Sequence, residues 1–282
     1  MKVIKNIITD EERSFYGIKE AHFINIKTAG PLDGESSLKE AKDVVVEKSE
    51  FTLRYPFWHD YNLELKECQL TETARAAIWY SNNVIISDCN FNSVKALREC
   101  NNVNVRMSNI ESTEVFWYCN DVNIQKSELV GEYAFLNSKN ININDIKFKG
   151  KYSFQYVENV VIRNSYLDTK DAFWGSKNVT VYDSTIKGEY LGWYAKNLKL
   201  VNCVIIGTQP LCYCENLILE NCEMIDTDLA FEYSTVQATI VNEIESVKNP
   251  ISGYIKATGI REIILDENKK ENSNCLIEVV GK

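Results

Sequence analysis

The fold is decided by the stretch Tyr118-Cys119-Asn120-Asp121-Val122-Asn123-Ile124-Gln125-Lys126-Ser127-Glu128-Leu129, because its pattern returns along almost the whole chain at one interval. We take the residue that follows the Asn or Asp as the zero position of each repeat. Zero positions 19 residues apart are Val103, Val122, Ile141, Val160, Val179, Leu198, Leu217 and Val236. Upstream, Val84, Leu63, Val44 and Ile24 continue the series with gaps of 19, 21, 19 and 20 residues. A repeat of this length is typical of a solenoid, in which each repeat stacks on the next.

Each repeat carries three short apolar segments, and none of them is large enough to bury its own face. The first segment alternates, with apolar residues at the zero position and two residues later, as in Val122 and Ile124. This is the period of a half-buried strand. A second large apolar residue follows seven after the zero position, and a third lies six before it, as in Leu129 and Phe116. Three short strands per repeat predict a parallel β-helix.

The expected fold is therefore all-β: a single-stranded, right-handed parallel β-helix of about 12 coils, mostly of 19 residues. The right hand is the usual one for parallel connections. We expect one domain over residues 1–282. Within it, residues 1–20 lack the repeat and are predicted to form an N-terminal cap, because an uncovered strand edge invites association. Residues 21–244 are predicted to form the coils, and residues 245–282 an irregular last turn and a C-terminal cap.

Two columns of equivalent residues are predicted to have structural roles. The residue before each zero position is Asn or Asp, as in Asn83, Asn102 and Asp121. Asn tolerates the left-handed backbone and bonds along a stack, so this asparagine column is expected to form turns. Five residues after the zero position stand Cys68, Cys89, Cys203 and Cys222, where other repeats carry Ser. A slot shared by Cys and Ser indicates small inward-facing residues and reduced thiols.

Composition and charge exclude several classes of function. The net charge of −9 and the lack of a basic stripe argue against a nucleic-acid partner. No segment has the length and apolar character of a membrane span, and the N-terminus does not look like a secretory signal. We therefore predict a cytoplasmic protein with no membrane partner. No phosphate loop, dinucleotide fingerprint or complete metal site is found, so no cofactor and no metal are predicted.

One face of the predicted helix is aromatic and charged, and we call it the strip. Five residues before the zero position runs its tryptophan column, which contains all five tryptophans: Trp58, Trp79, Arg98, Trp117, Leu136, Gln155, Trp174 and Trp193. One residue later runs its outer row, which includes Glu40, His59, Tyr80, Glu99, Tyr118, Asn137, Tyr156, Tyr194 and Tyr213. Charged members within both indicate that the strip faces solvent or a groove, since an interior ladder would not hold unpaired charges.

An exposed aromatic strip interleaved with carboxylates suits an extended carbohydrate, with sugar faces on flat rings. The predicted substrate-binding residues are Trp58, Trp79, Tyr80, Trp117, Tyr118, Tyr156, Trp174 and Trp193. The alternative interpretation is that aromatics stack simply because identical slots are neighbours in a solenoid.

Charged residues concentrate in the N-terminal part of the strip. Glu40 and His59 would lie on adjacent coils, about 5 Å apart, close enough for a carboxylate to orient an imidazole. Acid, base and guanidinium groups in one groove support proton abstraction or glycosidic cleavage. The candidate catalytic residues are His59, Glu40, Arg54, Arg75, Arg98 and Glu99, with Arg75 beside a two-residue insertion. A hydrogen-bonded surface histidine is the competing interpretation of His59.

Several segments resemble a family of microbial proteins of about this length, the domain of unknown function 3737. They are Arg54–His59, Lys151–Val157, Leu167–Trp174 and Gly207–Cys214. The resemblance implies a right-handed β-helix of the pectin-lyase-like kind, and it implies no activity and no catalytic residues. Carbohydrate enzymes are frequent on that fold, but this is an analogy of fold alone. The clustered Asp calcium site of pectate lyases is missing, which weakens the lyase version.

The sequence thus favours a β-helix that binds a carbohydrate along the strip and processes it, if at all, as a lyase or hydrolase. The alternative is a non-catalytic protein-interaction or structural scaffold that uses the same strip. Neither the substrate nor the oligomeric state follows from the sequence.

Overall fold

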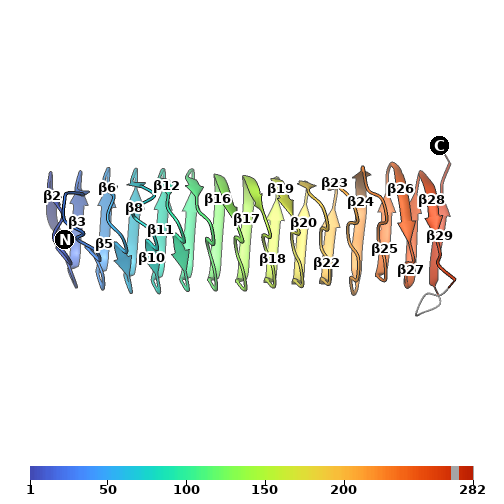
Figure 1. Ribbon diagram of the computed structural model, residues 1–282, viewed down its shortest axis with the longest axis horizontal. Helices are drawn as coiled ribbons and strands as arrows, with labels where there is room; N and C mark the ends of the chain where they lie inside the picture. The colour runs from blue at the N-terminus through green and yellow to red at the C-terminus, as the bar shows by residue number, and fades with distance from the viewer. Residues whose placement is uncertain (268–272, 282) are drawn as a thin grey trace. The chain divides into compact units, whose positions relative to one another are not determined.

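The computed structural model describes residues 1–267 and 273–281. It divides into two compact units, Met1–Lys147 and Phe148–Lys282, which we treat separately. The described residues form strands and turns with no helix, and the strands stack in parallel as a β-solenoid (Figure 1). The predicted all-β parallel solenoid is confirmed, with about 14 turns where about 12 were expected.

In unit 1 the strands form three parallel rows, one for each predicted segment. The first row pairs β1 (Lys2–Lys5), β3 (Lys19–Ile24), β5 (Lys42–Glu47), β8 (Tyr61–Lys66), β11 (Asn82–Ser87), β14 (Asn101–Arg106) and β16 (Asn120–Glu132). The second row pairs β2 (Ile8–Thr9), β4 (Lys27–Thr28), β6 (Glu50–Phe51), β9 (Gln69–Leu70), β12 (Asn90–Asn92), β15 (Asn109–Glu111) and the end of β16. The third row is β7 (Phe57–Trp58), β10 (Ile78–Trp79) and β13 (Leu97–Arg98). Strand β17 (Lys139–Lys151) contains the division between the units.

Unit 2 repeats the first two rows. Its first row pairs β18 (Glu158–Arg163), β20 (Lys177–Tyr182), β22 (Lys196–Val201), β24 (Leu217–Ile225), β25 (Thr235–Ile240), β27 (Ser252–Ala257) and β29 (Asn274–Val279). Its second row pairs β19 (Tyr166–Lys170), β21 (Thr185–Lys187), β23 (Val204–Ile206) and the end of β24. Near the C-terminus, β26 (Glu243–Lys248) pairs with β28 (Gly259–Ile264).

The third predicted strand is regular only in β7, β10 and β13. In other coils the same segment is a series of turns in which alternate residues have positive φ, as in Glu114 (56°), Phe116 (57°) and Tyr118 (54°). A single apolar position per coil does not distinguish a two-residue strand from such a turn. In both forms the residue six before the zero position is buried, as Phe57 and Phe116 are.

The segment predicted as an N-terminal cap is instead a coil, because β1 and β2 pair in register with β3 and β4. The zero position before Val44 is Ala21, which pairs with it, and not Ile24. The segment Ala21-His22-Phe23-Ile24 allowed either Ala21 or Ile24 to be the zero position. The coil is also longer than the 19-residue repeat, because the equivalent residues Lys27 and Glu50 are 23 residues apart.

Strands also continue into the segment predicted as an irregular C-terminal cap. Val236 pairs with Gly253, and Gly253 pairs with Cys275, so the first row runs on to β29. These two coils depart from the 19-residue period, which is why the repeat could not be followed past Val236 in the sequence. Residues 268–272 and 282 of the predicted cap lie outside the described residues.

The asparagine column forms the predicted ladder of turn residues. Asn83 has φ of 56° and donates its side-chain amide to Asn62 at 2.8 Å. It also accepts a hydrogen bond from the amide of Asn102 at 2.9 Å. The side chains therefore bond from coil to coil while the backbone turns through the left-handed region.

This ladder makes Asn83 a sensitive surface position. Asn83→Ala should lower the free energy of unfolding by about 1–3 kcal/mol, because it removes two hydrogen bonds and replaces a residue that tolerates left-handed backbone with one that tolerates it less well. Asn83→Gly loses the same hydrogen bonds, but glycine has no Cβ and adopts left-handed backbone readily. The decrease in the free energy of unfolding should therefore be smaller for Asn83→Gly than for Asn83→Ala. Urea unfolding of the two variants measures the difference, and equal losses would show that the backbone conformation contributes nothing.

The slot five residues after the zero position is inward-facing, as predicted. Cys68, Cys89, Cys203 and Cys222 are each at most 3% exposed. A side chain in this slot also accepts a hydrogen bond from the backbone of the preceding coil. The backbone N–H of Cys89, for example, donates to the Ser108 hydroxyl at 3.1 Å. All nine cysteines are free thiols.

Candidate functional site

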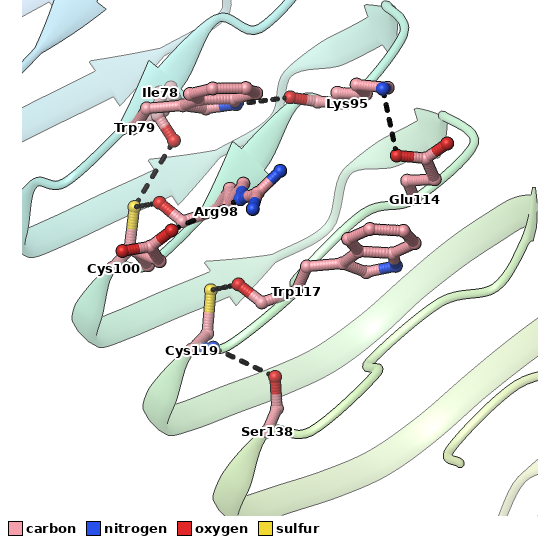
Figure 2. A network of polar contacts seen from close by, with 10 residues as sticks. Ile78, Trp79, Lys95, Arg98, Cys100, Glu114, Trp117, Cys119 and Ser138 are labelled. Carbon is pink, nitrogen blue, oxygen red and sulfur yellow. Dashed lines mark hydrogen bonds and ion pairs between the residues drawn. The ribbon is translucent and has the colours of Figure 1, made fainter. Parts of the chain in front are cut away.

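The tryptophan column of unit 1 is a stack of indole rings with a cationic side chain at one end and another between two of the rings. The indole rings of Trp58 and Trp79 are parallel within 5°, with centroids 5.1 Å apart. The Arg98 guanidinium lies 5.1 Å from the Trp79 ring and 5.7 Å from the Trp117 ring, between the two indoles in Figure 2. At the other end, the Lys39 ammonium lies 5.9 Å from the Trp58 ring. Such cation–π contacts hold the column together.

The indole N–H groups are also used within the solenoid. Each donates to a backbone carbonyl of the following coil: Trp58 to Ala76 at 2.6 Å, Trp79 to Lys95 at 2.8 Å, and Trp117 to Tyr133 at 2.5 Å. The stack therefore occupies both the faces and the N–H groups of Trp58 and Trp79. A sugar cannot lie flat on these two rings, as the sequence interpretation required, and only their edges remain half-exposed.

The outer row of unit 1 is the most exposed part of the strip. Glu40, His59 and Glu99 are exposed, Tyr80 is half-exposed, and Tyr118 is 46% exposed. All five have positive φ, between 52° and 64°. The left-handed corner turns each side chain outward beside the buried residue that follows it. The row thus presents one polar or aromatic side chain per coil.

The predicted Glu40–His59 pair is not formed. Glu40 instead interacts with the Tyr16 hydroxyl, and this carboxylate raises the pKa of Tyr16. The His59 ring stacks on Tyr80, with centroids 4.9 Å apart and planes within 14°. Both residues contact a tyrosine of another coil instead of each other. The spacing of residues along the sequence cannot predict which of several neighbours a side chain contacts.

Arg98 and Glu99 contact each other rather than the other candidate catalytic residues. The Arg98 Nε atom lies 3.2 Å from a Glu99 carboxylate oxygen. Nearby, Lys95 Nζ pairs with Glu114 at 3.1 Å (Figure 2). The strip therefore carries ion pairs that run both along and across its coils.

Arg54 and Arg75 lie apart from the outer row, in a cleft of about 850 Å³. Arg54 bonds to the carboxylate of Asp33, and its Nε lies 3.1 Å from a Glu35 oxygen. Arg75 is exposed and donates to the Tyr55 hydroxyl at 3.4 Å. Tyr55 in turn packs on Trp58, with ring centroids 4.9 Å apart. The cleft therefore adjoins the strip through Tyr55, while His59, Glu40 and Arg98 do not line it.

Unit 2 holds the remaining predicted binding residues. Trp174 and Trp193 stack with centroids 5.5 Å apart, and Trp174 also contacts Tyr194 at 5.3 Å. Tyr156 is 52% exposed and leans over Gly175, where a Cβ would lie 2.7 Å from its ring. Glycine at that position of the outer row makes room for the Tyr156 ring.

The described residues offer neither a metal cluster nor a membrane helix. No three His, Cys, Asp or Glu side chains among them are arranged to hold a metal ion. Nor does this part of the chain include a helix with the length and hydropathy that crossing a membrane requires.

Comparison with protein families assigns the chain. The model of a family described as "Protein of unknown function (DUF3737)" matches residues 2–278. The chain belongs to the DUF3737 family. A search of the curated proteins finds no match to it.

Solved structures similar to this DUF3737 protein share little sequence with it. The surface adhesin PfbA of Streptococcus pneumoniae matches with a TM-score of 0.37 and 10% identity, over 85% of this chain and 80% of that one. The A-module of the Azotobacter vinelandii mannuronan C-5 epimerase AlgE4 gives 0.32 and 10%, over 78% and 90%. A tailspike double mutant of E. coli bacteriophage HK620 gives 0.37 and 8%, over 98% and 72%. At this level of similarity no activity transfers to the DUF3737 chain.

Two features of the DUF3737 chain were missed in the sequence. The first is the loop Gly30–Asp33 in the cleft wall, which the coil length would have revealed had Ala21 been taken as the zero position. The second is Asp60, which is 1% exposed in a column of inward-facing residues. Its Oδ1 accepts from the Ala41 backbone N–H at 2.9 Å, and its buried Oδ2 has no partner among the described residues. Burial raises the pKa of Asp60 well above its usual value.

Proposed function

We propose that this DUF3737 protein binds a carbohydrate along the outer row of the strip. The observation that carries the proposal is the row itself: Glu40, His59, Tyr80, Glu99 and Tyr118 stand on successive coils, outward and largely exposed. Coils are about 4.8 Å apart, so the row offers a regular line of contacts to a chain of sugar units. Sugar hydroxyls hydrogen bond to charged side chains, and sugar C–H groups pack on tyrosine.

The contacts within the strip favour binding over catalysis. The outer row packs on the tryptophan column, with Tyr80 against Trp58 and Tyr118 against the Arg98 guanidinium, and side chains held in this way lose less conformational entropy on binding. The candidate acid and base are each engaged elsewhere, Glu40 with Tyr16 and His59 with Tyr80. Processing of the glycan would require Glu40 and His59 to leave those partners. Because His59 is both an outer-row contact and a candidate catalytic residue, His59→Ala should weaken glycan binding and abolish any turnover of a bound glycan.

A glycan array tests the proposal with two tyrosines of equal exposure. Tyr118→Ala removes an outer-row contact and should weaken binding of any recognised glycan about tenfold or more, which corresponds to about 1.4 kcal/mol. Tyr61→Ala is the matched control, because Tyr61 is also 46% exposed but lies outside the strip. Binding should be unchanged in that variant.

The possible outcomes separate carbohydrate binding from the scaffold alternative. If the parent protein binds no glycan on the array, the proposal fails. If Tyr118→Ala and Tyr61→Ala bind equally well, the glycan binds elsewhere on the surface, and the outer row has no role. The ring stacking favours a structural role for the tryptophan column in either case, so Trp58 and Trp79 are not useful test positions.

A further inference from the structure

The two coils of unit 1 that exceed 19 residues are longer at the same corner, and the two longer corners flank a short one. Between the second and third rows, the coil that contains β6 needs only residues 52–54. The preceding coil uses residues 29–35 at this corner, and the following coil uses residues 71–75. Equivalent residues are accordingly 23 apart across the first of these coils and 21 apart across the second.

These three corners make the cleft, which we call the insertion cleft. Thr52–Arg54 form its floor, and the loops at Gly30–Asp33 and Glu72–Arg75 form its two walls, with Val94 at the edge. A solenoid tolerates insertions at such corners, and insertions of this kind gather on binding faces. The volume of about 850 Å³ falls within the range of small-molecule sites.

The first wall is held in a defined conformation. The Leu32 backbone N–H donates to the Asp10 carboxylate at 3.0 Å. Glycine is required beside it, because a Cβ on Gly30 would lie 2.3 Å from the same carboxylate oxygen, and one on Gly34 would lie 1.9 Å from the Asp10 carbonyl oxygen. The Arg54 guanidinium joins this wall to the floor through Asp33. The loop is therefore anchored at its base, at its middle and to the floor.

The chemistry of the cleft matches a polyhydroxylated ring better than an anion or an apolar ligand. Arg54 is already balanced by Asp33 and Glu35, and the exposed Glu72 adds a further negative charge. Paired guanidinium and carboxylate groups supply donors and acceptors side by side, as neighbouring hydroxyls need. Leu32, which is 61% exposed at the rim, offers an apolar surface for C–H groups.

We propose that the insertion cleft is a saccharide subsite that holds the end or a branch of the glycan on the outer row. This inference rests on the proposed function, and it assigns Arg75 as the main contact because Arg75 is exposed and donates to the neutral Tyr55 hydroxyl rather than to a carboxylate. Tyr55 lies between the cleft and Trp58, so a chain leaving the cleft reaches the strip directly.

Saturation-transfer NMR with five monosaccharides tests the subsite: glucose, galactose, mannose, N-acetylglucosamine and galacturonic acid. We expect a saturation-transfer signal from at least one neutral sugar. Titration of that signal should show that Arg75→Ala lowers the affinity for the sugar about tenfold. Arg106→Ala, which removes an exposed arginine of unit 1 outside the cleft, should leave the signal unchanged. Deleting residues 30–33 restores a 19-residue coil, so this variant should stay folded by circular dichroism and lose the signal.

The outcomes distinguish this inference from the proposed function. If Tyr118→Ala weakens array binding while Arg75→Ala and the shortened loop keep full affinity for every glycan and sugar, the cleft is no subsite and the outer row still stands. A signal from galacturonic acid alone, lost in high salt, would overturn the assignment to neutral hydroxyls. Loss of array binding in the cleft variants, without loss in Arg106→Ala, would support the subsite, and the outer row is supported as well only if Tyr118→Ala also weakens binding.

Discussion

Asp60→Asn should stabilise the protein above about pH 4, by an amount that grows with pH. The Asp60 carboxyl is 1% exposed, and burial raises its pKa well above the usual value. Between the unfolded and folded pKa values, the native state binds a proton that the unfolded state has released. Stability of the parent protein should therefore fall as pH rises, by about 1.4 kcal/mol per unit, until the folded pKa is reached.

Asn has the shape of the protonated acid and keeps an oxygen to accept the Ala41 backbone N–H. The variant therefore removes the titration with little change in packing. Urea unfolding of parent and variant at pH 4, 5, 6 and 7 should give curves that nearly coincide at pH 4 and diverge upward. Asp88→Asn, at an exposed position, is the control and should show no such divergence. A constant offset between parent and Asp60→Asn at all four pH values would contradict the argument.

Phe116→Ala should lower the free energy of unfolding by about 3–5 kcal/mol, because it removes a whole ring from the core and leaves a cavity. Phe116 and Phe135 are both fully buried and stack with centroids 4.9 Å apart and planes within 7°. Since successive coils share this slot, the cavity would lie between two coils that cannot close on it without breaking their backbone hydrogen bonds.

Tyr118→Ala is the control for this effect, two residues further along the same turn. Its side chain is 46% exposed, and its backbone has the same left-handed conformation, with φ of 54° against 57° for Phe116. Its loss should stay within about 1 kcal/mol, as is usual for exposed positions. Thermal or urea unfolding measures both variants, and equal losses would show that the stack of phenylalanines does not carry the stability assigned to it.

Several features of the candidate site followed from the sequence because they depend on period alone. The repeat, which steps by 21 residues at this coil, placed Trp58 over Trp79 and His59 beside Tyr80, and the structure has both pairs in contact. The spacing also indicated that the tryptophan column faces outward, since Arg98 occupies one of its positions. What each ring does with its faces could not be predicted, because it depends on side-chain torsions and on partners such as the carbonyl of Ala76.

The insertion cleft shows where reasoning from the period fails. A choice of Ile24 over Ala21 shifted one coil by three residues and concealed the extra length of the loop at residues 29–35. The sequence favoured Arg54 and Arg75 for their charge and grouped them with His59 and Glu40, whereas the structure places both arginines in the insertion cleft, which His59 and Glu40 do not line. Arg75 lies on a longer corner and Arg54 on the short corner between the two longer ones, where Tyr55 and Asp33 are their partners.

By itself, the sequence determined the parallel solenoid, the inward Cys and Ser slot, and the asparagine ladder, because each depends only on equivalent residues lying one coil apart. Only the tertiary structure decided which ring faces are covered, that Glu40 interacts with Tyr16, that Asp60 is buried with an unpartnered oxygen, and that two insertions enclose one cleft. These depend on side-chain directions and on corner lengths, and neither is fixed by a repeating pattern of apolar residues.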